Sequence, residues 1–239
     1  MFEILLLVAA FAAAFVQATT GFAYAIIMMA LLPIFMPVLE ATQLLMFGSI
    51  MACGYITLKY YKHINFKIIA IPLAIGLIGT YIGVNALFTL DEGIVVKALG
   101  GLLILLALYF YFFSRSIHIP NNLLTASVAG AFSGLMGGLF NISGPPIALY
   151  CMAVTKDKEE YIATVQFYFV VLIAFKMIYL GFQQGFSEMV VTRIPIIILG
   201  SVAGMLLGLK VLIKLSINAL KRLVYLVMVI SGLWYILGP

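Results

Sequence analysis

The chain has 239 residues, of which 65% are hydrophobic and 9% are charged. A soluble domain is nearer half apolar and a quarter charged, so this composition excludes a water-soluble enzyme, a secreted domain and a nucleic-acid-binding protein. The net charge of +5 is then explained by basic loops that orient membrane spans. The apolar runs are continuous rather than alternating, which predicts helices and not a transmembrane barrel.

Ten apolar runs follow one another along the chain, separated by short polar loops. The hydrophilic segment 114–122 divides them into two halves, residues 1–113 and 123–239. We therefore expect an all-α, polytopic transmembrane bundle of two repeats joined by a cytoplasmic linker. The predicted runs are 3–16, 22–37, 42–58, 66–88 and 93–113 in the first half, and 123–136, 144–154, 161–181, 190–209 and 216–237 in the second.

Short motifs recur in the two halves in the same order. Gly79-x-x-x-Gly83 matches Gly204-x-x-x-Gly208 at a shift of 125 residues, and Ala41-Thr42-Gln43 lies near the position of Ala163-Thr164-Val165-Gln166. Internal repeats of this kind are common in secondary transporters. For the four glycines themselves, we expect close helix packing.

The basic residues indicate how the two repeats are oriented. If each half opens with a hairpin that returns to its starting side, the repeats are inverted and both termini lie outside. Ten basic residues then face the cytoplasm, and only Lys97 and Arg193 lie near the outside. If each opening segment crosses once instead, five basic residues lie inside and seven outside, so the positive-inside rule favours the inverted arrangement.

The first two runs of each half are too short to span a membrane alone. They have 11 to 16 residues, or about 16–24 Å of helix, against a hydrocarbon core of ~30 Å. We interpret each pair as broken or re-entrant helices that meet near mid-membrane, and three spanning helices follow each pair. In the second half, one helix is predicted to end near Met136 and the next to begin near Gly144, with Asn141 and Ser143 as N-caps and Pro145 in the first turn.

Paired breaks at corresponding positions are the best sequence indication of a transport site. Helix N-termini carry free N–H groups and partial positive charge, so two of them brought together favour a small anion. Gln43 and Gln166 also fit interhelical hydrogen bonding, and Lys176 also fits snorkelling to the membrane interface. The candidate substrate-binding residues are Gln17, Thr19, Thr20, Gly21, Gln43, Gly137, Gly138, Asn141, Ser143, Gly144, Pro145, Gln166 and Lys176.

The stretch from Gly130 to Pro146, GAFSGLMGGLFNISGPP, followed by Ala163-Thr164, resembles the TauE/SafE family of sulfite exporters, also called the toluene sulfonate uptake permease family. The second half matches the family pattern well, whereas in the first half Gly21-Phe22-Ala23 lacks most of the glycines. The resemblance implies a multi-pass protein of the bacterial inner membrane that exports sulfite or a related organosulfur or carboxylate anion. The expected partners are sulfite or an organosulfonate as the substrate and membrane lipid as the surroundings, and a homo-oligomer stays open. No cofactor or metal is expected.

The residues also bear on four other functions: an anion channel, an uptake carrier, an intramembrane protease and a structural subunit. An anion channel, or an uptake carrier for a sulfonate or carboxylate, stays open because sequence does not separate these from an exporter. An intramembrane serine protease needs a base near its nucleophile, but His63 and His118 both lie in polar loops. A purely structural subunit of a larger complex has no use for unwound helices. The acidic residues all lie at span ends or in loops, which argues against a carboxylate proton relay.

Overall fold

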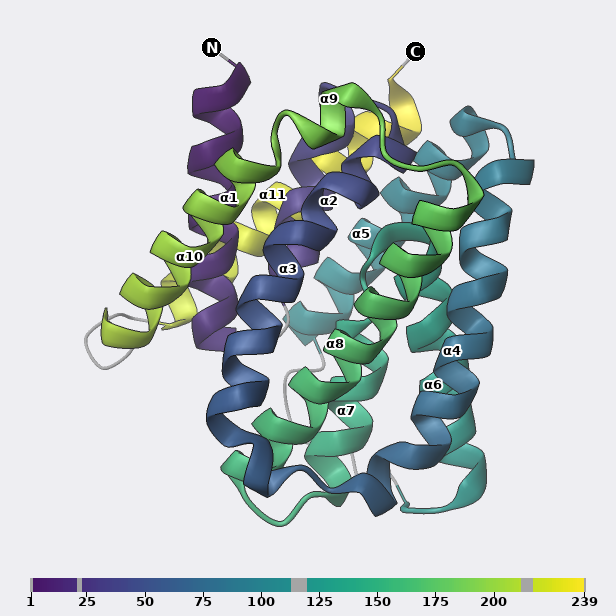
Figure 1. The fold of residues 1–239 in the computed structure, drawn as a ribbon, viewed down its shortest axis with the longest axis vertical. Coiled ribbons are helices and arrows are strands. Elements are labelled where there is room, and N and C mark those ends of the chain that lie inside the picture. Colours follow the sequence, from purple (N-terminus) through teal and green to yellow (C-terminus); the bar gives the residue numbers. More distant parts are fainter. Residues whose placement is uncertain (1, 21–22, 113–119, 212–216, 239) are drawn as a thin grey trace. The chain divides into compact units, whose positions relative to one another are not determined.

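The structure is a computed structural model that describes residues 2–20, 23–112, 120–211 and 217–238, without the side chains of 19–20, 211 and 217–223. Every regular element in these ranges is helical (Figure 1), which confirms the predicted all-α class. The helices are α1 (Phe2–Thr20), α2 (Tyr24–Leu31), α3 (Val38–Tyr60), α4 (Phe66–Thr89), α5 (Glu92–Phe112), α6 (Leu123–Phe140), α7 (Gly144–Val154), α8 (Lys158–Gln183), α9 (Glu188–Val191), α10 (Ile194–Val211) and α11 (Ile217–Leu237), with short 3-10 helices η1 (Leu32–Ile34) and η2 (Tyr61–His63).

Six helical segments among the described residues are long and apolar enough to cross a membrane. Large apolar side chains on them are exposed, including Ile78, Ile178 and Leu199, as expected for surfaces that contact lipid. The six segments are Val38–His63, Phe66–Thr89, Glu92–Phe112, Leu123–Phe140, Lys158–Gln183 and Glu188–Lys210.

Two compact units make up the chain, and each takes helices from both sequence halves. Unit 1 consists of Met1–Gly48, Thr89–Arg115 and Ser187–Pro239, and unit 2 of Ser49–Phe88 and Ser116–Phe186. Unit 1 therefore holds the opening pair α1–α2 together with α5, α10 and α11. Unit 2 holds the opening pair α6–α7 together with α4 and α8, and α3 contributes to both units.

In unit 1, α10 packs against α1 through its glycines (Figure 1). A Cβ atom at Gly204 would lie 2.1 Å from the Phe11 carbonyl oxygen, and one at Gly208 would lie 2.8 Å from the Phe15 carbonyl oxygen. Only glycine permits so close an approach of two backbones. The predicted packing role of this glycine pair is therefore confirmed.

In unit 2, α4 packs against α6 in the same way. A Cβ atom at Gly79 would lie 2.9 Å from the Ala131 carbonyl oxygen, and one at Gly83 would lie 2.5 Å from the Leu135 carbonyl oxygen. The packing role predicted for this pair is also confirmed. In each unit, the glycine-bearing helix of one sequence half lies against the first helix of the other half's opening pair.

Both opening pairs return to the end from which they start. In unit 1, the rings of Phe2, at the start of α1, and Phe35, just after η1, have centroids 5.8 Å apart. In unit 2, the Tyr150 hydroxyl, near the end of α7, donates to Asn121 Oδ1 at 3.1 Å, just before α6 begins. Each pair is thus a helical hairpin rather than a single crossing.

Three of the four hairpin arms, α1, α2 and α6, differ from the predicted lengths, whereas α7 has the predicted bounds 144–154. The first helices, α1 and α6, have 19 and 18 residues, or about 27–29 Å, and only α2 and α7 are short, with 8 and 11 residues. The predicted helix end near Met136 is wrong, because Gly137 and Gly138 continue α6 to Phe140. Gly138 is helical and packs closely on α4. A Cβ atom at this position would lie 2.5 Å from the Thr80 carbonyl oxygen.

Candidate functional site

The break between α6 and α7 is set by the backbone of Asn141. This residue has φ 60° and ψ 14°, the left-handed conformation that asparagine adopts more readily than most residues. Its N–H donates to the Gly137 carbonyl oxygen at 2.9 Å, which is the hydrogen bond of a left-handed C-cap. Asn141 therefore ends α6, and the prediction that it is an N-cap of the following helix is wrong.

Helix α7 begins at Gly144, as predicted, with Pro145 in its first turn. Ser143 is the N-cap residue but makes no side-chain capping bond, while its carbonyl oxygen accepts from Ser133 Oγ at 2.5 Å. Because Pro145 and Pro146 have no N–H, the free backbone donors at this helix end come from Ser143 and Gly144.

Lys176 of α8 reaches the same break. Its side chain is 1% exposed, and its Nζ donates to the Gly137 carbonyl oxygen at 3.2 Å. The snorkelling interpretation is therefore wrong, because the ammonium group is enclosed by protein. Among the described residues, the one ion pair joins His63 and Glu159, so the buried ammonium has no carboxylate partner there.

The Asn141 side-chain nitrogen is a buried donor without a partner at this position. The residue is 8% exposed, and its Nδ2 makes no hydrogen bond. Because the Gly137 carbonyl oxygen accepts both from the Asn141 N–H and from Lys176 Nζ, the two residues meet at one backbone atom. The Ser143 hydroxyl lies beside them, since a Cβ atom at Gly137 would be 2.2 Å from it. The break thus gathers a cation and neutral donors.

The remaining predicted site residues are distributed over both units. In unit 1, Gln17 Oε1 accepts from the Tyr24 N–H at 2.9 Å and caps the start of α2, and Gln43 is buried on α3. In unit 2, Gln166 is buried on α8. Gly21 and the side chains of Thr19 and Thr20 lie outside the described residues.

Sequence reasoning missed Ser133, which holds the carbonyl of Ser143 across the hairpin. Ser133 lies three residues after Gly130, within the glycine-rich stretch, and it is fully buried. A small polar residue on the glycine face of an apolar helix was the available signal.

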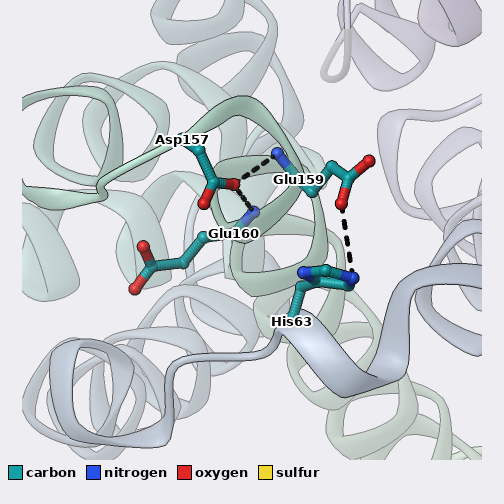
Figure 2. A network of polar contacts seen from close by, with 4 residues as sticks. All are labelled: His63, Asp157, Glu159 and Glu160. Carbon is teal, nitrogen blue, oxygen red and sulfur yellow. Dashed lines mark hydrogen bonds and ion pairs between the residues drawn. The ribbon is translucent and has the colours of Figure 1, made fainter.

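A polar network closes the opposite end of α8 (Figure 2). Asp157 Oδ1 accepts from the N–H groups of Glu159 and Glu160, both at 2.9 Å, and so caps α8. Glu160 accepts from Asn65 Nδ2 and, at 2.8 Å, from the Lys156 N–H. These bonds hold the α3–α4 loop against the α7–α8 loop, so both loops lie at the same end of unit 2.

An open pocket of about 440 Å³ lies at this network. It begins at the first turn of α8, 16 residues before Lys176, or about 24 Å along the helix. The pocket is therefore separate from the α6–α7 break. Its lining residues are Lys62, His63, Ile64, Asn65, Phe66, Lys67, Lys156, Asp157 and Glu160.

Replacing Glu160 by alanine is expected to lower the stability of the folded protein by about 1–3 kcal/mol, because it leaves two donors without acceptors. Glu160→Gln keeps one acceptor oxygen and should cost less. The control is Glu159→Ala, which removes only an exposed ion pair with His63 and should change stability by less than ~1 kcal/mol. Thermal unfolding in detergent measures all three, and equal effects of the two alanine variants would contradict this role for Glu160.

The fold and the site define the class of this protein. It is a polytopic membrane protein with long apolar helices, paired helical hairpins and a cation enclosed at a helix break. Discontinuous helices of this kind are typical of secondary transporters. A sequence model of the family described as Sulfite exporter TauE/SafE matches residues 6–235. The chain therefore belongs to the TauE/SafE family, whose members are multi-pass membrane transporters and not enzymes. Searches of curated proteins and of solved structures gave no match.

Proposed function

We propose that this transporter exports sulfite or a related small sulfur-containing anion, and that the α6–α7 break binds that anion. The observation that carries the proposal is the buried Lys176 ammonium, which donates to a neutral carbonyl oxygen 3.2 Å away. A buried charge is costly unless it is paired. An anion at the break would supply the missing partner.

The neutral groups around Lys176 suit an oxyanion. An ammonium has three N–H donors, and one of them points to Gly137. Asn141 Nδ2 adds an unused donor, and the N-terminus of α7 adds the partial positive charge of a helix of 11 residues. Ser143 and Gly144 provide the backbone N–H groups at that end, and Pro145 fixes the first turn.

The proposed membrane topology places residues 1–113 and 123–239 as inverted repeats, with the linker 114–122 in the cytoplasm. Two observations support it. Each opening pair returns to its starting end, which is the condition under which the basic residues favour inversion. The loops that carry Lys62 and Lys156 also share one end of unit 2, as the inverted arrangement requires.

The direction of transport follows from the charge of the substrate. In a bacterial inner membrane, the interior-negative potential favours exit of an anion by ~2.3 kcal/mol per charge per 100 mV. The test is sulfite flux from proteoliposomes, with the potential and the pH gradient clamped separately. We expect flux to follow the potential at equal pH on both sides. Flux that ignores the potential and requires a pH gradient would contradict this mechanism.

Replacing Asn141 by glycine is expected to weaken anion binding by about 1.5–3 kcal/mol, roughly 10- to 150-fold, because a hydrogen bond to a charged ligand is lost. Glycine adopts the left-handed conformation freely, so the break itself should persist. Equilibrium binding of sulfite to the purified protein measures the loss, and thermal unfolding provides the control. Unchanged affinity in Asn141→Gly would exclude this side chain from the site.

A further inference from the structure

We infer that the site selects anions with a single negative charge, such as hydrogen sulfite or an alkyl sulfonate, over doubly charged sulfite, sulfate or thiosulfate. This inference rests on the proposed function and specifies its substrate class. It follows from the number of charges that the protein places at the break.

Lys176 is the only buried cation among the described residues, and Glu160 is the only buried residue of opposite charge. Glu160 lies at the far end of α8, where Asn65 and the Lys156 N–H bind its carboxylate. Among the described residues, the protonated Lys176 therefore brings a single charge of +1 to the break. An anion of charge −1 makes the site neutral, whereas a dianion leaves one charge uncompensated in a medium of low dielectric constant.

The other groups near the break supply polarity without charge. Asn141 and Ser143 are neutral donors, and α6 and α7 contain no charged residue. Among the elements packed against α8, α7 carries the titratable groups Tyr150 and Cys151, α4 carries Tyr81 and Lys67, and η2 carries Tyr61, Lys62 and His63. On α8 itself, the titratable groups besides Lys176 are Tyr161, Tyr168, Tyr179 and the acidic and basic residues of the first turn. The charged members of this set all lie at the pocket end of α8.

This preference for singly charged anions, called the charge rule below, has a consequence for the pH dependence of transport. Sulfite and hydrogen sulfite interconvert near neutral pH, so a carrier for the singly protonated form moves a proton together with the anion. The proton then belongs to the substrate and needs no carboxylate in the membrane. Methanesulfonate keeps a single charge throughout this range, so the fraction of it that carries one charge does not change with pH.

The test compares four probes, namely methanesulfonate, sulfite, sulfate and thiosulfate, as ligands of the intact purified protein and as substrates in proteoliposomes held at equal pH on both sides. We expect methanesulfonate to bind at least about tenfold more tightly than sulfate or thiosulfate, as one unpaired buried charge costs well over 1.4 kcal/mol. We also expect the ratio of sulfite flux to methanesulfonate flux to rise as the pH falls.

Two variants separate the possible outcomes. Lys176→Arg should keep the preference for single charges, and Lys176→Met should lose binding of every probe. Dianions that bind as tightly as methanesulfonate, through a site that still requires Lys176, would overturn the charge rule and leave the proposed function standing. Binding of all probes that is unaffected by Lys176→Met would overturn both. A ratio of sulfite flux to methanesulfonate flux that does not change with pH would show that doubly charged sulfite is carried as well as hydrogen sulfite, and would overturn the rule.

Discussion

Replacing Lys176 by methionine is expected to reduce anion affinity at least about 100-fold, because removing one partner of a buried charge pair costs about 3–5 kcal/mol. Methionine keeps an unbranched side chain of similar length in the space that Lys176 fills. Sulfite or methanesulfonate binding to the purified protein measures the effect. Lys176→Arg is the matched variant and should retain most of the affinity, since it keeps the charge.

Without ligand, the same Lys176→Met substitution is expected to maintain or raise the stability of the folded protein. The wild-type Lys176 is 1% exposed and its ammonium donates to a neutral carbonyl oxygen, so its burial costs free energy. Lys176→Met should therefore unfold at an equal or higher temperature than the wild type when no anion is present. A variant that binds anions normally, or that loses binding only because it no longer folds, would contradict the role given to Lys176.

Replacing Gly134 by alanine is expected to destabilise unit 2 by about 1–3 kcal/mol through overpacking. The new Cβ atom would lie 2.1 Å from the Gly76 carbonyl oxygen, and a backbone atom cannot move aside as a flexible side chain can. Separation of α4 from α6 would also disturb the hydrogen bond from Thr80 Oγ1 to the Gly134 carbonyl oxygen, at 3.2 Å. Thermal unfolding in detergent measures the loss.

The matched control is Gly54→Ala on α3, where no atom lies within 4 Å of the added Cβ. There the higher helix propensity of alanine should leave stability unchanged or raise it by up to ~1 kcal/mol. The two substitutions are chemically identical, so opposite signs would isolate the packing of α4 on α6. Equal effects at Gly54 and Gly134 would show that this contact contributes little.

The sequence was sufficient for the helical class, for the packing role of the glycine pairs and for the start of α7. These features depend on local composition and spacing, as with Pro145 in the first turn of a helix. The end of α6 was not predictable in the same way. Gly137 and Gly138 favour a break locally, but both lie within α6, where Gly138 packs closely on Thr80 of α4, a contact between residues more than 50 positions apart.

The composition of the candidate site was only partly predictable for the same reason. Glycine, asparagine and proline in succession indicated the break, but the role of Asn141 as a C-cap depends on its left-handed backbone. The contact of Lys176 with Gly137 spans 39 residues, and an isolated lysine near a span end fits snorkelling equally well. Gln17 was predicted as a substrate-binding residue from its place before the break, and the hydrogen bond that its Oε1 accepts from the Tyr24 N–H was not predictable from that place.

The position of a bound anion tests the central claim most directly. Crystals of the protein soaked in selenite, the heavier analogue of sulfite, would reveal the ion by the anomalous scattering of selenium. The account predicts a peak at the α6–α7 break, with selenite oxygens within hydrogen-bond distance of Lys176 Nζ and Asn141 Nδ2. An ion bound only elsewhere, or a helix that runs unbroken from α6 into α7, would contradict it.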